Sequence, residues 1–118
     1  MKIDQEITLR TLKEFFGDDI IFKCDDTYDS IEMLDGKIKP PLEDFKSKYE
    51  EIKNVTIPFE TLRIERNYKL MNSDWTINND SPLSQEKIEE WKVYRQALRD
   101  LPANTTDPEN PVWPVPPN

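Results

Sequence analysis

The side chains that could do acid–base or nucleophilic chemistry lack the partners that such chemistry requires. The chain has no histidine, which removes the commonest general base and the commonest metal ligand. The single cysteine, Cys24, has no histidine to activate its thiol and cannot form an internal disulfide. Adjacent carboxylates such as Glu89 and Glu90 point apart on a helix. We therefore expect no enzyme activity, no cofactor and no bound metal, with catalysis through a lysine or tyrosine as the remaining alternative.

The acidic stretch between Asp18 and Asp35 is a second place where residue types suggest a site. It contains seven carboxylates and one lysine. A calcium loop aligned from Asp25 would need a glycine where Ser30 stands and a glutamate where Gly36 stands, so the register fails. Solvated carboxylates around a turn are the better interpretation, and mimicry of nucleic acid by this face is an open alternative.

Composition places the chain among small acidic proteins. Its 118 residues fit one domain, or one small domain with an appendage. Sixteen Lys and Arg against 24 Asp and Glu give a net charge of -8, which argues against nucleic acid as the partner. No apolar run reaches the length of a membrane helix and no signal peptide is recognisable, so we expect no membrane association and a cytosolic location.

Hydrophobic periodicity predicts four helices and one strand pair. The helices are expected over residues 4–16, with Asp4 as N-cap and Gly17 as the stop, from Pro40-Pro41 to Ile52, from Thr56-Ile57-Pro58 to about residue 72, and from Asp80-Ser81-Pro82 to Leu101, where Pro102 ends the last one. Two short runs, 20–24 and 30–34, are expected to pair as a hairpin around the turn 25–29, and residues 75–77 to be extended.

The proline-rich segment, residues 102–118, holds six of the ten prolines. Such a segment cannot join a helix or a central strand, and it favours extended polyproline II. Its P-x-x-P spacing suits aromatic grooves on another protein. The favoured alternative is that Trp113 packs into a groove of the chain's own helical hairpin, because a free exposed tryptophan lowers solubility.

These elements indicate an α+β fold dominated by helices. Residues 1–54 are predicted to form a helix–hairpin–helix unit, and residues 55–118 a helical hairpin followed by the proline-rich segment. Whether the two halves share one core is left open at this point, as is the oligomeric state.

The most informative positions for binding lie on the last predicted helix. Trp91, Tyr94, Arg95 and Leu98 fall along one side of it, and Trp, Tyr and Arg are the residue types most often found as binding hot spots. The alternative is structural: Arg95 pairs with Asp74 and stacks on Trp75, while Trp91 belongs to the core. The full set of predicted partner-binding residues is Arg66, Asp74, Trp75, Trp91, Tyr94, Arg95, Arg99 and Trp113.

Three ordered motifs resemble the C-terminal module of the tail assembly chaperones of tailed bacteriophages, also called tail fibre assembly proteins. They are Leu62-Arg63-x-x-Arg66-Asn67-x-x-Leu70-Met71-x-Ser73-Asp74-Trp75-Thr76, the run from Trp91 through Tyr94-Arg95-Gln96-Ala97-Leu98-Arg99-Asp100-Leu101-Pro102, and Pro111-Val112-Trp113-Pro114. The resemblance covers about residues 59–117. Residues 1–54 are similar to the N-terminal regions of tail-fibre chaperone-like phage proteins, except that Met33-Leu34 follows Ile31-Glu32 where relatives commonly carry an aromatic.

The resemblance implies a non-enzymatic protein that binds a tail or tail-fibre component and assists its folding or assembly in the host cell cytoplasm. Retention on the virion tail as a structural component is one alternative, and an acidic effector that binds a host protein is another. A small acidic partner can cover apolar surface on a β-rich client and keep it soluble. The hairpin over residues 20–34 is expected to offer an edge to which a client strand could add.

Overall fold

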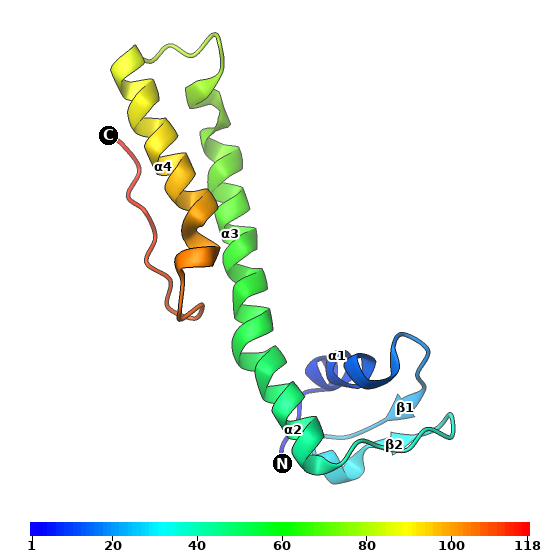
Figure 1. The fold of residues 1–118 in the computed structure, drawn as a ribbon. Coiled ribbons are helices and arrows are strands. Elements are labelled where there is room, and N and C mark those ends of the chain that lie inside the picture. Colours follow the sequence, from blue (N-terminus) through cyan, green and yellow to red (C-terminus); the bar gives the residue numbers. More distant parts are fainter. The chain divides into compact units, whose positions relative to one another are not determined.

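The computed structural model describes residues 1–118, which divide into two compact units, Met1–Ile57 and Pro58–Asn118. The fold is α+β and dominated by helices, as predicted, with one two-stranded antiparallel sheet. The predicted division between residues 54 and 55 stays a prediction. The two units are described separately below (Figure 1).

Helix α1 (Gln5–Phe16) begins and ends as its sequence predicts. The Asp4 carboxylate accepts a hydrogen bond of 3.0 Å from the Ile7 N–H, which confirms Asp4 as the N-cap. Gly17 adopts a positive φ of 77°, and its N–H donates to the Lys13 carbonyl. A glycine suits this position because a Cβ is disfavoured at positive φ.

The strand pair is shorter than predicted. Strand β1 (Phe22–Lys23) pairs antiparallel with β2 (Glu32–Met33), with Phe22 opposite Met33 and Lys23 opposite Glu32. The runs 20–24 and 30–34 do not pair along their whole length, because a 3-10 helix (Tyr28–Ser30) occupies the connection and the N-terminal residues bond to it. Lys2 forms an isolated bridge with Thr27, and the Ile3 N–H donates to the Asp26 carbonyl.

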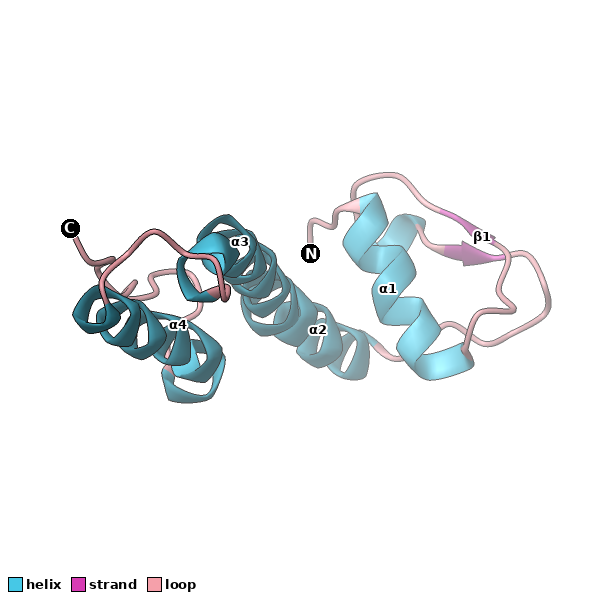
Figure 2. Ribbon diagram, turned by 90° about the horizontal axis from the view of Figure 1, so that it is seen from above, coloured by secondary structure: helices cyan, strands magenta, loops and turns pink.

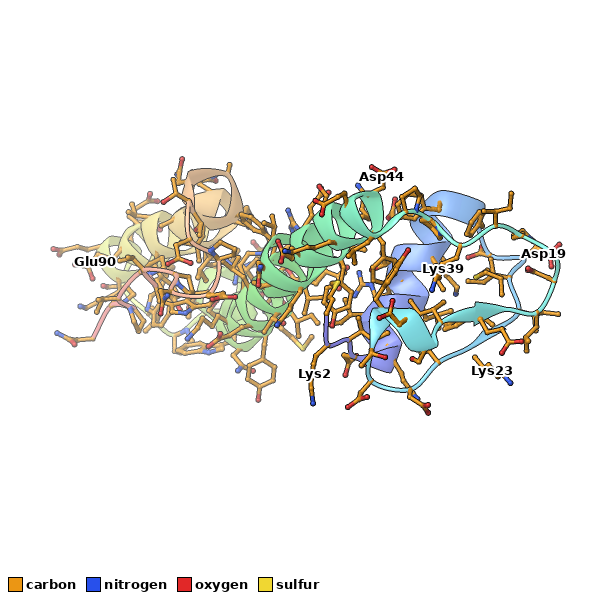
Figure 3. The ribbon with its side chains drawn as sticks, turned by 90° about the horizontal axis from the view of Figure 1, so that it is seen from below. Lys2, Asp19, Lys23, Lys39, Asp44 and Glu90 are labelled. Carbon is orange, nitrogen blue, oxygen red and sulfur yellow. The ribbon has the colours of Figure 1, made fainter.

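The core of the N-terminal unit lies between α1, the strand pair and helix α2 (Leu42–Glu51) (Figure 2). Half-buried side chains of both strands pack against it. The Tyr49 hydroxyl accepts a hydrogen bond from the Asp4 N–H, and the Tyr28 hydroxyl donates to the Pro40 carbonyl. Charged side chains such as Lys2 and Lys23 project outward (Figure 3). The buried apolar residues of this core are Ile3, Leu12, Ile31, Phe45 and Tyr49.

No loop separates the second and third predicted helices. A π-helical segment (Ile52–Thr56) follows α2 directly and continues into helix α3 (Ile57–Ser73). Pro58 has no N–H to donate, and in a regular α-helix its ring would clash with the Asn54 carbonyl. The wider π turn before Pro58 accommodates both restrictions, so the predicted fresh start at Thr56 is replaced by continuous helical backbone.

The C-terminal unit is a helical hairpin of α3 and helix α4 (Gln85–Asn104), which lie side by side in Figures 1 and 2. Helix α4 begins later than predicted, because the Ser84 hydroxyl, and not a group at 80–82, accepts from the Lys87 N–H as N-cap. It also continues past Pro102 to Asn104. Pro102 removes one backbone bond near the helix end, and the Thr105 hydroxyl donates to the Leu101 carbonyl there.

Residues 75–77, predicted as extended, belong instead to a 3-10 helix (Asp74–Ile77) that follows α3. The Thr76 side chain is fully buried, and its hydroxyl donates to the Ser73 carbonyl over 2.6 Å, a local bond that favours the tight turn. Residues 111–118 have no regular secondary structure, as predicted, and run beside α4 (Figure 1).

Candidate partner-binding site

Arg95 of α4 links the two helices of the hairpin, and its guanidinium is buried. One terminal nitrogen, Nη1, donates to the Leu70 carbonyl over 2.6 Å and to the Ser73 hydroxyl over 2.7 Å. The other, Nη2, lies 2.7 Å from an Asp74 carboxylate oxygen. The predicted Arg95–Asp74 pair is therefore confirmed. With only 5% of Arg95 exposed, it joins α4 to the C-terminal end of α3.

Trp75, Trp91 and Tyr94 form a row of aromatic contacts beside this pair. The ring centres of Trp75 and Trp91 are 6.4 Å apart, and those of Trp91 and Tyr94 are 5.5 Å apart in a T-shaped arrangement. Trp75 packs against Trp91, in place of the predicted stack on Arg95. Tyr94 is buried and Trp91 half-buried, whereas half of Trp75 is exposed. The row thus runs from the hairpin interior to the surface.

The two other predicted arginines lie on facing helices. The Arg66 Nε donates to the Asn67 side chain, and its Nη1 makes a long contact of 3.5 Å with the Arg99 carbonyl. Arg66 is half-buried and the Arg99 side chain is exposed. Of the predicted set, Arg99, Asp74 and Trp75 are therefore open to a partner, while Tyr94 and Arg95 support the surface from below.

Trp113 of the proline-rich segment packs against the chain's own hairpin. The Lys69 ammonium of α3 lies 5.1 Å from the centre of the Trp113 ring. Residues 114–118 and the α4 face from Lys87 to Ala97 line a hollow of about 450 Å³. The favoured sequence interpretation, a segment laid on the hairpin, is thus correct for Trp113. The segment leaves Val112 and Val115 exposed.

Sequence reasoning missed the most exposed apolar residues of α3. Ile64, Tyr68 and Met71 are 71%, 64% and 66% exposed, and Trp75 continues the same spacing of four, three and four residues. The packed side of α3 is built from Phe59, Leu62, Arg66 and Leu70, whereas Asn67 and Tyr68 are exposed. A second apolar period on the same helix was the signal that could have revealed this surface.

The surroundings of the Cys24 thiol disfavour its use as a nucleophile. Burial, and then the negative charge of Asp25, raise the pKa of the Cys24 thiol, which disfavours the nucleophilic thiolate. Cys24 lines a hollow of about 520 Å³ with Gln5, Leu9 and Phe22. No three His, Cys, Asp or Glu side chains are grouped so as to hold a metal ion. None of the helices has the length and apolar character needed to cross a membrane.

Comparison with known proteins identifies the C-terminal unit. No curated protein and no solved structure matches the chain. A family model described as phage tail assembly chaperone protein matches residues 59–118, which is 60 of the 118 residues and spans both helices of the hairpin and the proline-rich segment. The chain therefore belongs to the phage tail assembly chaperone family.

Proposed function

We propose that this tail assembly chaperone binds a tail-fibre component, keeps it soluble before assembly, and alters no covalent bond. The observation that carries the proposal is the apolar surface of the C-terminal unit, the part that the family model matches. Large apolar side chains remain exposed there on a chain of net charge -8. Exposed apolar patches mark interaction sites, and negative charge keeps the resulting complex soluble.

The helical surface supports this role better than the strand pair. Each strand has two residues, so a client strand added to that edge would gain few backbone hydrogen bonds. The exposed residues of α3 offer larger apolar area on a preformed helix. The site of action is the host cell cytoplasm, where fibre subunits are made and where their unpaired strand edges would otherwise aggregate.

Co-expression tests the proposal directly. A tail-fibre protein of the same phage is produced with and without the chaperone, and its soluble fraction and complex formation are measured. The expected result is that the fibre protein is soluble only when the chaperone is also expressed, and that the soluble fibre protein then co-purifies with the chaperone. Unchanged fibre solubility would contradict the proposal. Purified virions provide the second readout: a chaperone is absent from them, whereas a structural component is present in a fixed ratio to the fibre.

A further inference from the structure

The proline-rich segment contacts the hairpin through one of its edges only. The prolines that recur at every third residue are half-buried: Pro111, Pro114 and Pro117. Val112 and Val115, which follow them at the same spacing, are 85% and 86% exposed. A period of three residues is that of the polyproline II helix, and the segment runs extended beside α4 (Figure 1). The P-x-x-P edge of the segment therefore faces the chain's own hairpin.

The part of α4 that this edge contacts has the chemistry of a polyproline groove. Together with the segment, Val93, Tyr94 and Ala97 line a hollow of about 450 Å³, and we call these three residues the α4 groove. Grooves that bind polyproline II segments are lined by aromatic side chains, a part that Tyr94 takes here. The charged residues that line the same hollow, Lys87 and Glu90, pair with each other at 3.0 Å. The prolines therefore meet a mainly apolar surface with one tyrosine.

Few contacts hold the segment in this groove. No hydrogen bond joins residues 111–118 to α3 or α4. Trp113 supplies a cation–π contact, with the Lys69 ammonium 5.1 Å from its ring centre. The hollow beneath the segment shows that the prolines do not fill the groove. A segment with so few contacts opens at a much lower cost in free energy than the helices that carry it.

We propose that the α4 groove binds a polyproline II segment of the client, and that residues 111–117 occupy the groove as a competitor in its absence. The inference rests on the proposed function, since it takes the client as the source of that segment. The occupant follows from the segment already seated there, because a groove that holds one P-x-x-P edge fits another of the same spacing. A helix or a β-strand, with periods of 3.6 and 2 residues, presents no such edge.

The first test uses a fluorescent peptide with the sequence of residues 109–118, so it needs no knowledge of the client. Its binding to the full-length chain is measured by fluorescence anisotropy. Trp113→Ala removes the contact with Lys69 and leaves the groove open for a larger fraction of the time. This variant is expected to bind the peptide at least about tenfold more tightly than the parent chain. Absence of binding to the variant, or equal binding by the variant and the parent chain, overturns the proposal.

Matched reagents establish that the P-x-x-P edge is what the groove recognises. Val112→Ala, on the exposed edge of the segment, is the control variant and should bind the peptide as the parent chain does. A peptide with alanine at positions 111, 114 and 117 is expected to bind Trp113→Ala at least about tenfold more weakly. Equal binding of the two peptides overturns the proposal. Pro114→Gly with Pro117→Gly is a second opening variant, used if Trp113→Ala alters the circular dichroism of the hairpin.

A substitution in the groove then locates the site. Ala97→Glu, combined with Trp113→Ala, places a charged side chain at a half-buried position of the groove. It is expected to weaken peptide binding by at least about tenfold. Ala103→Glu in the same background is the matched control, because Ala103 is an exposed alanine of α4 that does not line the hollow. Equal peptide affinity of the two glutamate variants overturns the assignment to the α4 groove.

Co-expression separates failure of this inference from failure of the proposed function. If the parent chain does not alter fibre solubility, the proposed function itself fails. If the parent chain and Ala97→Glu solubilise the fibre protein equally well, the proposed function stands and the groove assignment is overturned. Loss of solubilisation in Ala97→Glu, with activity retained in Ala103→Glu, is the result expected from the proposal.

Discussion

The two units of this chain are stabilised in different ways. The N-terminal unit surrounds one cluster of buried apolar side chains, in which Phe45 lies between Tyr28 and Tyr49 at ring distances of 5.3 and 5.7 Å. The C-terminal unit has a thin buried layer, and a buried arginine network joins its two helices. The first arrangement derives its stability mainly from apolar burial, and the second depends more on directed polar bonds.

This difference is informative about function. A hairpin of two helices has few faces to bury, so polar contacts and the packed proline-rich segment supplement its small core. Because α3 packs on one side only, its other side is exposed to solvent. The family match falls on this unit. The N-terminal unit also exposes apolar side chains, such as Ile21 and Ile38, but they lie in separate short segments and form no helical stripe. Exposed apolar side chains thus form a helical stripe in the unit that the chaperone family model matches, and not in the N-terminal unit.

The largest effect is expected from Phe45→Ala in the N-terminal unit. Phe45 is fully buried, so truncation should lower the free energy of unfolding of this unit by about 3–5 kcal/mol. All three tryptophans lie in the C-terminal unit, so tryptophan fluorescence reports on the unfolding of that unit alone. Far-UV circular dichroism reports on the helices of both units. We expect the tryptophan transition to stay in place. Phe15→Ala, at a largely exposed ring, is the control; a tryptophan transition that moves with Phe45→Ala would show that the units unfold as one.

A smaller loss of unfolding free energy, this time in the C-terminal unit, is expected from Arg95→Met. The variant leaves the Leu70 carbonyl and the Ser73 hydroxyl without their donor and removes the cation beside Asp74. Because the Asp74 side chain is 60% exposed and can be solvated, we expect a loss of about 2–3 kcal/mol, below that of a fully buried pair. Denaturation followed by tryptophan fluorescence measures it, with Arg99→Met as the exposed control. Equal stability of the two variants would contradict the role given to Arg95.

Local chemistry made several elements predictable from the sequence. Asp4 and Gly17 set the ends of α1 because an N-cap carboxylate and a positive-φ glycine act within one turn of the helix. The Arg95–Asp74 pair was predictable because an arginine beside aromatic residues on one expected helix can pair with a carboxylate across the hairpin. The helical hairpin and the N-terminal helix–hairpin–helix order follow from hydrophobic periodicity, whereas the packing of Trp113 was the favoured of two alternatives.

Other features could not be predicted because the sequence offers two alternatives at the same place and does not decide between them. Ser84 and Asp80 are both suitable N-caps, and only the path of the connection decides that Ser84 is used. Pro58 and Pro102 suggested helix boundaries, yet a π turn and the proximity of a helix end allow helical backbone at both. The exposed apolar face of α3, which carries Ile64, Tyr68 and Met71, was missed because two apolar periods overlap on one helix, and which of them packs depends on the position of α4.

The smallest predicted effect is a pH dependence confined to the N-terminal unit. The Lys37 ammonium, together with the Ile21 and Lys37 backbone N–H groups, holds the pKa of Asp35 down at about 2 against partial burial. A folded-state pKa below the unfolded value stabilises the fold when the carboxyl is ionised, which is above about pH 4. That contribution is then lost as the pH falls toward 2. The connection after β2 carries Asp35, so the contribution belongs to the unit with the strand pair.

Asp35→Asn isolates this contribution. The difference in unfolding free energy between the parent chain and Asp35→Asn is expected to be constant above about pH 4 and to shrink between about pH 4 and pH 2, because the parent carboxyl then becomes neutral as well. Asp19→Asn is the control, since the Asp19 backbone carbonyl, which accepts from the Lys37 ammonium, is retained. A stability difference that does not change with pH would show that the charge of Asp35 contributes nothing to the stability of the N-terminal unit. The hydrogen bonds of residue 35 would then stabilise the N-terminal unit without help from a charge. In the C-terminal unit, by contrast, the network around Arg95 contains an ion pair with Asp74.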